Sequence, residues 1–104
     1  MFIYTISRKY ERVALVDLHR LIIAWRAGDL KALEHEFVDS TKADYPAIYQ
    51  VLVVRRNQAW ADALKAKLAG SGVSFVAVGA GHLVGPDSVQ AELKKRGIVA
   101  ERVN

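Results

Sequence analysis

The hydrophobic residues in the first two thirds of the chain recur at helical spacing. Between residues 13 and 26 they lie three or four positions apart, which predicts an amphipathic helix with one buried stripe, formed by Leu15, Leu18, Ile22 and Trp25. Gly28 predicts the end of this helix, and Asp29 predicts the N-cap of a second helix that runs to Phe37. Pro46 predicts the start of a third helix.

A fourth helix is expected after Asn57, which either caps it or interrupts the helix before it. Trp60, Leu64 and Leu68 share one face of this helix because they recur every four residues. The glycines at positions 70 and 72 predict its end.

The pattern changes after these glycines. Residues 73–78 form a continuous apolar run rich in β-branched side chains, which is typical of a strand buried on both faces. Pro86 and Asp87 predict the start of a helix and Gly97 predicts its end, while residues 98–103 predict a closing strand. Because such parallel connections are almost always right-handed, these elements predict a right-handed β-α-β unit.

The expected fold class is therefore α/β, with a helical N-terminal region packed on a small partial parallel sheet that ends in the β-α-β unit. Residues 2–6 supply one further strand candidate. A parallel sheet normally has more strands and carries helices on both faces. We therefore expect residues 1–104 to form a single incomplete domain, a fragment of a larger α/β domain.

Composition narrows the choice of function. The chain has no cysteine, which excludes disulfides, thiolate zinc sites and cysteine nucleophiles. Its 15 basic and 11 acidic residues form no basic stripe with aromatic platforms, so nucleic acid is not an expected partner. No stretch reaches the ~20 apolar residues of a membrane span, and residues 1–10 do not have the charge order of a secretory signal.

The first candidate for chemistry is the segment Gly79-Ala-Gly81-His82, which directly follows the predicted strand. Ligands of open α/β sheets bind at the carboxyl ends of strands, glycines permit tight turns, and imidazole can bind a metal or act as a base near neutral pH. The alternative is a histidine that serves only as a structural hydrogen-bond partner. A dinucleotide site is disfavoured because Gly85 does not occupy the required third glycine position.

The second candidate is the arginine pair Arg55-Arg56 with the following Asn57. A guanidinium group can hold a carboxylate or an oxyanion, although a solvated pair at a helix junction is the simpler interpretation. His19 falls within the apolar stripe of the first helix and is expected to be a partly buried structural residue. His35 lies between two glutamates and is expected on a solvated face.

Four sequence blocks together resemble the C-terminal half of the TraB/GumN family, which includes the Tiki-like metal-dependent proteases. The blocks are residues 24–30, 55–60, 75–87 and 93–103, and the resemblance extends from about residue 13 to the end of the chain. It implies a peptidase-like hydrolase that uses a divalent metal and acts on a peptide or small molecule. It also points to the bacterial cell envelope or periplasm.

The resemblance assigns roles to individual residues. Gly79-Ala-Gly81-His82 matches the second of two Gly-x-x-His motifs, and Arg56 with Asn57 matches the Arg-Asn block of the family. This implies that His82 and Arg56 are catalytic, that His82 is a candidate metal ligand, and that Gly79, Gly81 and Asn57 shape the turn or contact substrate. The sequence lacks the first Gly-x-x-His motif, so neither tight metal binding nor hydrolysis is expected from this chain alone.

Two non-enzymatic alternatives remain open. The same pocket could hold a peptide signal, or a ligand such as haem, without turnover. The chain could instead self-associate, with exposed sheet edges and the aromatic residues Trp25, Tyr49 and Trp60 pairing two copies.

Overall fold

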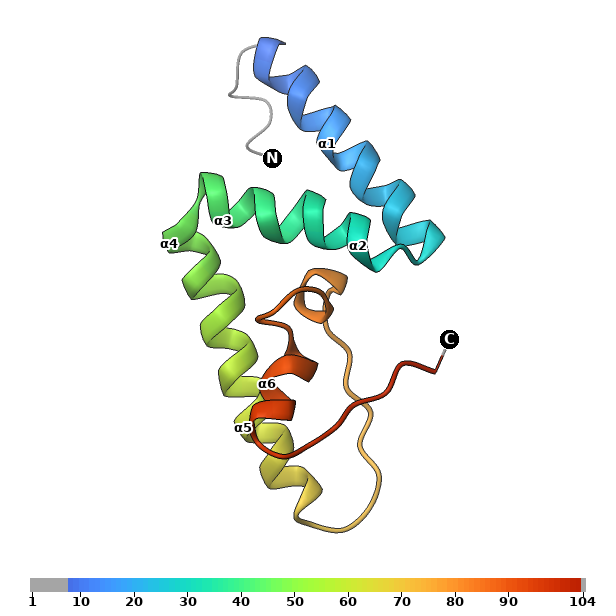
Figure 1. Ribbon diagram of the computed structural model, residues 1–104, viewed down its shortest axis with the longest axis vertical. Coiled ribbons are helices and arrows are strands. Elements are labelled where there is room, and N and C mark those ends of the chain that lie inside the picture. The colour runs from blue at the N-terminus through green and yellow to red at the C-terminus, as the bar shows by residue number, and fades with distance from the viewer. Residues whose placement is uncertain (1–7, 104) are drawn as a thin grey trace.

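The computed structural model describes residues 8–103, with side chains described from residue 18 onward. Within this range the chain is helical and contains no strand (Figure 1). In chain order the elements are α1 (Arg8–Ala27), α2 (Leu30–Leu33), η2 (Glu34–Asp39), α3 (Ser40–Asp44), α4 (Pro46–Tyr49), η3 (Gln50–Val54), α5 (Arg55–Leu68), η4 (Ala80–Leu83) and α6 (Val89–Lys95).

Two long helical segments each contain a turn of π-helix. α2, η2 and α3 follow one another without a break, as do α4, η3 and α5, and η2 and η3 are the π-helical parts. Figure 1 shows α1, the α2–α3 segment and the α4–α5 segment as three successive arms. An extended loop then returns from the end of α5 to the short 3₁₀ turn η4, and α6 packs beside α5.

The predicted helix ends at Gly28 and Gly97 are confirmed. Both glycines adopt positive φ angles, 66° and 78°, which a residue with a Cβ rarely tolerates. The carboxylate of Asp29 caps α2 by accepting the Ala32 N–H at 3.0 Å. Pro46 occupies the start of α4, as predicted.

Three predicted boundaries are wrong. The helix expected to end at Phe37 continues through η2 and α3 to Asp44. α6 begins at Val89 instead of Pro86, because the hydroxyl of Ser88 accepts the Ala91 N–H at 3.2 Å and so makes Ser88 the N-cap. Asn57 neither caps nor interrupts a helix, since it lies inside α5.

Buried side chains form two separate cores. The first core lies where α1, the α2–α3 segment and the α4–η3 turns meet, and consists of Ala24, Leu33, Val38, Tyr49, Val53 and Val84. The second core lies between α5 and α6, and consists of Ala61, Val89 and Leu93 with Trp60, Leu64 and Ile98 against it. The radius of gyration is 15.9 Å, whereas a compact domain of this length has about 13 Å. The chain is therefore elongated around two small cores.

One face of the α4–α5 segment is buried at every fourth residue. Tyr49, Val53, Asn57 and Ala61 are 2%, 3%, 0% and 0% exposed. In a regular α-helix, residues four apart are rotated by about 40° from one another, because a turn takes 3.6 residues. The wider π-helical turn η3 reduces this rotation between Tyr49 and Val53. The polar side chain of Asn57 is thereby carried into an otherwise apolar buried line.

The predicted α/β fold is wrong for the described part of the chain. Residues 73–79 and 98–103 are loops, and no backbone ladder joins them within the described residues. A strand needs a neighbouring backbone for its hydrogen bonds, which the apolar run alone does not supply. Val73 and Phe75, predicted to be buried, are 102% and 94% exposed. The further strand candidate, residues 2–6, lies outside the described residues.

The apolar stripe predicted for the first helix is not buried. Between 44% and 64% of the side-chain surface stays exposed at Leu18, Ile22 and Trp25. Leu21 and Ala24 pack on the first core in their place, and the side chain of Leu15 lies outside the described residues. No helix in the described part is long and apolar enough to cross a membrane, which agrees with the sequence prediction.

The buried carboxylate of Glu92 fixes the end of α6. It accepts hydrogen bonds from Lys95 Nζ at 2.8 Å and from Arg96 Nη1 at 3.0 Å, and the residue is 2% exposed. Arg96 Nε also donates to Asp62 Oδ1 of α5 at 2.6 Å, so this network joins the two helices. The hydrogen bond from Lys95 and the pairing with Arg96 outweigh burial and lower the pKa of Glu92 below its usual value.

We expect the fold to lose stability in acid through Glu92. Its folded pKa lies below the unfolded value of about 4.3, so its stabilising contribution is fully present above that value and is lost as the pH falls through the folded pKa. Glu92→Gln should lower the free energy of unfolding at neutral pH by about 1–3 kcal/mol, because it removes the charged acceptor from a buried network.

Urea unfolding at a series of pH values measures this contribution. The difference between Glu92→Gln and the parent chain should shrink as the pH falls. Glu101→Gln is the control, because Glu101 is exposed. A difference for Glu92→Gln that is the same at every pH would contradict the assignment.

Candidate functional site

The turn that carries His82 lies between the two cores. The His82 N–H donates to the Gly79 carbonyl oxygen at 3.0 Å, which closes η4. Val84, just after the turn, belongs to the first core. The His82 ring contacts Trp60 of the second core, with ring centroids 4.7 Å apart and planes inclined at 58°. His82 is therefore fixed from two sides.

The two glycines of the turn have different surroundings. A Cβ on Gly81 would lie 2.4 Å from the ring of Phe37, which itself packs on the first core. A Cβ on Gly79 would meet nothing closer than His82 Cδ2 at 3.8 Å, and the φ of Gly79 is −61°, which any residue can adopt. The close approach therefore belongs to Gly81, whereas Gly79 contributes its main-chain carbonyl.

Hydrogen bonds to Asn57 define the protonation of the His82 ring. The Asn57 Nδ2 group donates to the main-chain carbonyl oxygen of Asp87 at 2.7 Å. A carbonyl can only accept, so the amide oxygen of Asn57 must face His82, whose Nδ1 is 2.7 Å away. That oxygen can only accept as well, so Nδ1 carries the proton. In the neutral ring, Nε2 is then the nitrogen with the free lone pair.

The surroundings of His82 favour its neutral form. Burial lowers the pKa of His82 below its usual value, and the positive charge of Arg56 lowers it further. Both effects favour the neutral ring, which is the state in which an imidazole can accept a proton.

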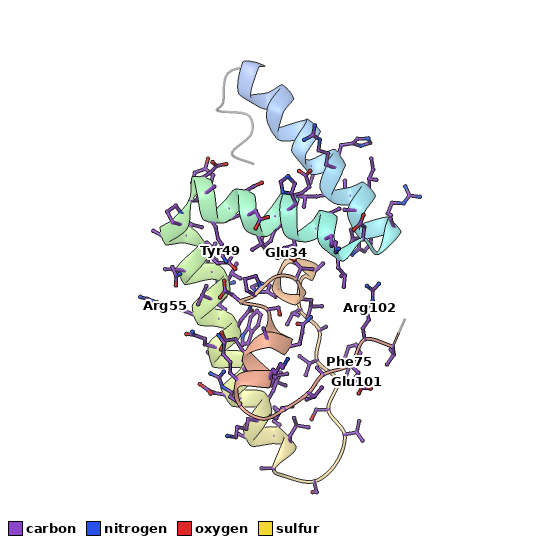
Figure 2. The ribbon with its side chains drawn as sticks, viewed as in Figure 1. Glu34, Tyr49, Arg55, Phe75, Glu101 and Arg102 are labelled. Atoms are coloured by element: carbon purple, nitrogen blue, oxygen red, sulfur yellow. The ribbon has the colours of Figure 1, made fainter. Side chains whose placement is uncertain are left out.

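Arg56 is exposed on the first turn of α5, one residue before Asn57. Because the amide of Asn57 contacts His82, Arg56 and His82 lie in one region, as predicted. Arg55 is exposed too, and Figure 2 shows it on the outer side of the same helix, away from α6.

A third polar group, the carboxylate of Asp87, was missed by the sequence analysis. Asp87 Oδ2 accepts the hydroxyl proton of Tyr49 at 2.8 Å and pairs with Lys42 Nζ at 3.0 Å. Burial raises the pKa of Asp87, but the hydrogen bonds from Lys42 and Tyr49 outweigh this and hold it below its usual value. Burial, reinforced by Asp87, raises the pKa of Tyr49, which therefore stays a hydrogen-bond donor.

The site residues come from three parts of the chain. Lys42 and Tyr49 lie on α3 and α4, Asn57 lies on α5, and His82 and Asp87 lie on either side of the loop that precedes α6. A signal for Asn57 did exist in the sequence, since a polar residue at every-fourth spacing from Val53 and Ala61 marks a buried amide. Nothing in the sequence indicates that the main-chain carbonyl of Asp87 would be its partner.

The other two histidines lie outside this region. His19 is exposed, so the prediction of a partly buried structural residue is wrong. His35 is exposed as predicted, with its Nδ1 3.6 Å from Asp39 Oδ2 one helical turn away.

The described residues do not fit a metal held by this chain alone. Among them, no group of three or more His, Cys, Asp or Glu side chains is placed to hold a metal ion. Protein metal sites of the kind expected use about three or four ligands. His82 can offer only Nε2, because its Nδ1–H donates to the Asn57 amide oxygen. The metal-binding expectation for His82 therefore lacks its other ligands here.

An open apolar hollow adjoins the turn on the side of the first core. It has a volume of about 260 Å³ and is lined by Leu21, Ile22, Trp25, Leu33, Phe37, Ala80 and Gly81. Two of these residues belong to η4 itself, so the hollow and His82 share the same short turn.

The fold and the site together define a helical protein that presents an oriented, neutral histidine on a glycine-containing turn. Residues 1–102 match the model of the TraB/PrgY/gumN family, so the chain belongs to this family. The resemblance noted in the sequence is thereby confirmed for essentially the whole chain. Neither the curated proteins nor the solved structures contain a match to this chain.

The unequal surroundings of the two glycines give a paired test. Gly81→Ala should lower the free energy of unfolding by about 1–3 kcal/mol, because the added methyl group forces the Phe37 ring out of place. Gly79→Ala should change it by no more than about 0.5 kcal/mol. Chemical denaturation of both variants measures the difference. Equal effects would show that the contact between Gly81 and Phe37 does not constrain the turn.

Proposed function

We propose that this chain contributes a proton-accepting histidine and an anion-binding arginine to the active site of a peptidase-like TraB-type hydrolase. The observation that carries the proposal is the 2.7 Å contact between His82 Nδ1 and Asn57 Oδ1, which leaves Nε2 as the basic nitrogen. In this role Nε2 accepts a proton from the attacking water.

Arg56 supports the proposal from the neighbouring helix. Its guanidinium group is exposed and close enough to His82 to lower the pKa of the ring. A cation in this place would hold a substrate carboxylate, or stabilise the oxyanion that forms when water adds to a carbonyl group. The apolar hollow beside the turn supports a peptide-like substrate, because it offers space for one large apolar side chain.

The proposed site needs groups beyond those described here. The single lone pair on His82 Nε2 cannot both accept a proton and bind a metal. A divalent metal would therefore require about three other ligands, supplied by residues outside the described part or by another chain. We therefore expect little or no hydrolysis from residues 8–103 acting alone.

The test is peptide hydrolysis by the protein as its gene encodes it, with a fluorescence-quenched peptide library and added divalent metal ions. His82→Gln should lower kcat by roughly 10²-fold or more, because it removes the proton acceptor. Arg56→Gln should lower kcat/KM by on the order of 10²-fold if the guanidinium stabilises the oxyanion.

His35→Gln is the matched control, since His35 is an exposed histidine away from the site. Its activity should equal that of the parent protein. Wild-type activity in His82→Gln would refute the role given to His82.

A second candidate function is self-association. The expected sheet edges are absent from the described residues and Tyr49 is buried, so that predicted basis is wrong, but an exposed apolar loop favours association. Phe75 is 94% exposed and Val73 is 102% exposed, which is unusual for two large apolar side chains so close together. Figure 2 shows Phe75 on the extended loop, away from α5. Two copies that cover each other's loops would remove this surface from water.

Sedimentation velocity over a range of protein concentrations tests self-association. We expect a dimer that Phe75→Lys converts to a monomer with unchanged helical content. Leu68→Lys is the control, because Leu68 is an exposed apolar residue of α5 outside this loop. A monomer at every concentration would rule the candidate out.

A further inference from the structure

The main-chain carbonyl of Asp87 is linked to His82 through the amide of Asn57. The carboxylate of Asp87 is anchored in the first core. The anchor is Tyr49, whose hydroxyl donates to Asp87 Oδ2 at 2.8 Å and whose ring is 2% exposed. Lys42 pairs with the same oxygen at 3.0 Å and lies over the Tyr49 ring, 5.0 Å from its centroid. A charge-assisted hydrogen bond to a buried tyrosine is strong and directional. The position of the Asp87 carboxylate is therefore set by α3 and α4.

The anchored side chain also fixes the carbonyl group of the same residue. The turn before it is also fixed by the main chain, because Gly85 adopts a φ of +84° and its carbonyl accepts the Ser88 N–H at 3.3 Å. With this turn closed and the side chain anchored, the Asp87 carbonyl stays directed at the Asn57 amide, 2.7 Å away.

The orientation of the Asn57 amide decides which tautomer of His82 is stable. With its NH₂ group on the Asp87 carbonyl, Asn57 offers its oxygen to His82 and selects the Nδ1–H form. A rotation of the amide by half a turn would offer the NH₂ group to His82, which selects the Nε2–H form. That rotation would also bring the amide oxygen against the Asp87 carbonyl, two acceptors face to face. The carbonyl therefore blocks the rotated state.

We propose that Asp87 is a positioning residue for His82, which it holds in the Nδ1–H form through its own carbonyl group and the amide of Asn57, with Tyr49 and Lys42 as the anchor of its carboxylate. The consequence for hydrolysis rests on the proposed function, because only the Nδ1–H form presents a lone pair on Nε2. The tautomer itself does not depend on any reaction.

The experiment is nitrogen NMR of the histidine rings in the ¹⁵N-labelled full chain, at a pH where the rings are neutral. The parent chain should show His82 with its proton on Nδ1. Asp87→Ala and Tyr49→Phe should move His82 to a mixture of both tautomers, with His19 and His35 unchanged as internal references. Asn57→Leu removes the amide partner of the ring. Its spectrum therefore shows the tautomer ratio of His82 when the preference for Nδ1–H is completely lost.

Ser88→Ala is the matched control. It removes the N-cap of α6 from the residue next to Asp87, so it lowers stability without touching the Asp87 carboxylate or Asn57. His82 should keep its proton on Nδ1 in this variant. An equal change in Ser88→Ala would overturn the proposal, because general loosening of the loop would then explain the result.

An unchanged tautomer in both Asp87→Ala and Tyr49→Phe would also overturn the proposal. Asp87→Asn covers the case in which Asp87→Ala does not fold, because it keeps an acceptor for Tyr49 but loses the charge pair with Lys42. It should shift the tautomer less than Tyr49→Phe does. Because the NMR experiment uses no substrate, its outcome is independent of the hydrolysis assay.

Discussion

The burial of one amide group organises the region around His82. Asn57 occupies a fully buried position in line with Val53 and Ala61, where an apolar side chain would be expected. Burying an amide without partners is costly, so its nitrogen and its oxygen must both be bonded. The Asp87 carbonyl and the His82 ring are the partners, and they come from the two ends of one loop. The requirement to satisfy a single side chain therefore closes the loop onto α5 and orients the imidazole.

The sequence predicted those features of the fold that depend on neighbouring residues. Gly28, Gly97, Asp29 and Pro46 end or start helices as expected, because each acts through its own backbone or a cap three residues away. The strand at residues 73–78 was wrong, because a strand depends on a second backbone that the pattern cannot supply. The prediction that the apolar stripe of α1 is buried was wrong for a related reason. Periodicity indicates which residues share a face but not what covers that face.

Only part of the site could be predicted from the sequence. The family resemblance drew attention to His82, Arg56 and Asn57, and the structure brings these three residues together. The part played by Asp87 was hidden, because its main-chain carbonyl is common to all residues and its carboxylate partners lie 38 and 45 positions earlier in the chain. The burial of Asn57, by contrast, left a signal in the sequence, its every-fourth spacing from Val53 and Ala61.

The presence of two cores affects the fraction of molecules in which the site is complete. His82 contacts Trp60 of the second core, while Gly81 and Asp87 contact Phe37 and Tyr49 of the first. Small cores open locally at free energies below that of global unfolding. The competent fraction of molecules is then the joint probability that both cores are closed, which is lower than the probability for either core. Anything that bound across the two cores would have its apparent affinity reduced by this fraction, and once bound it would hold both cores closed.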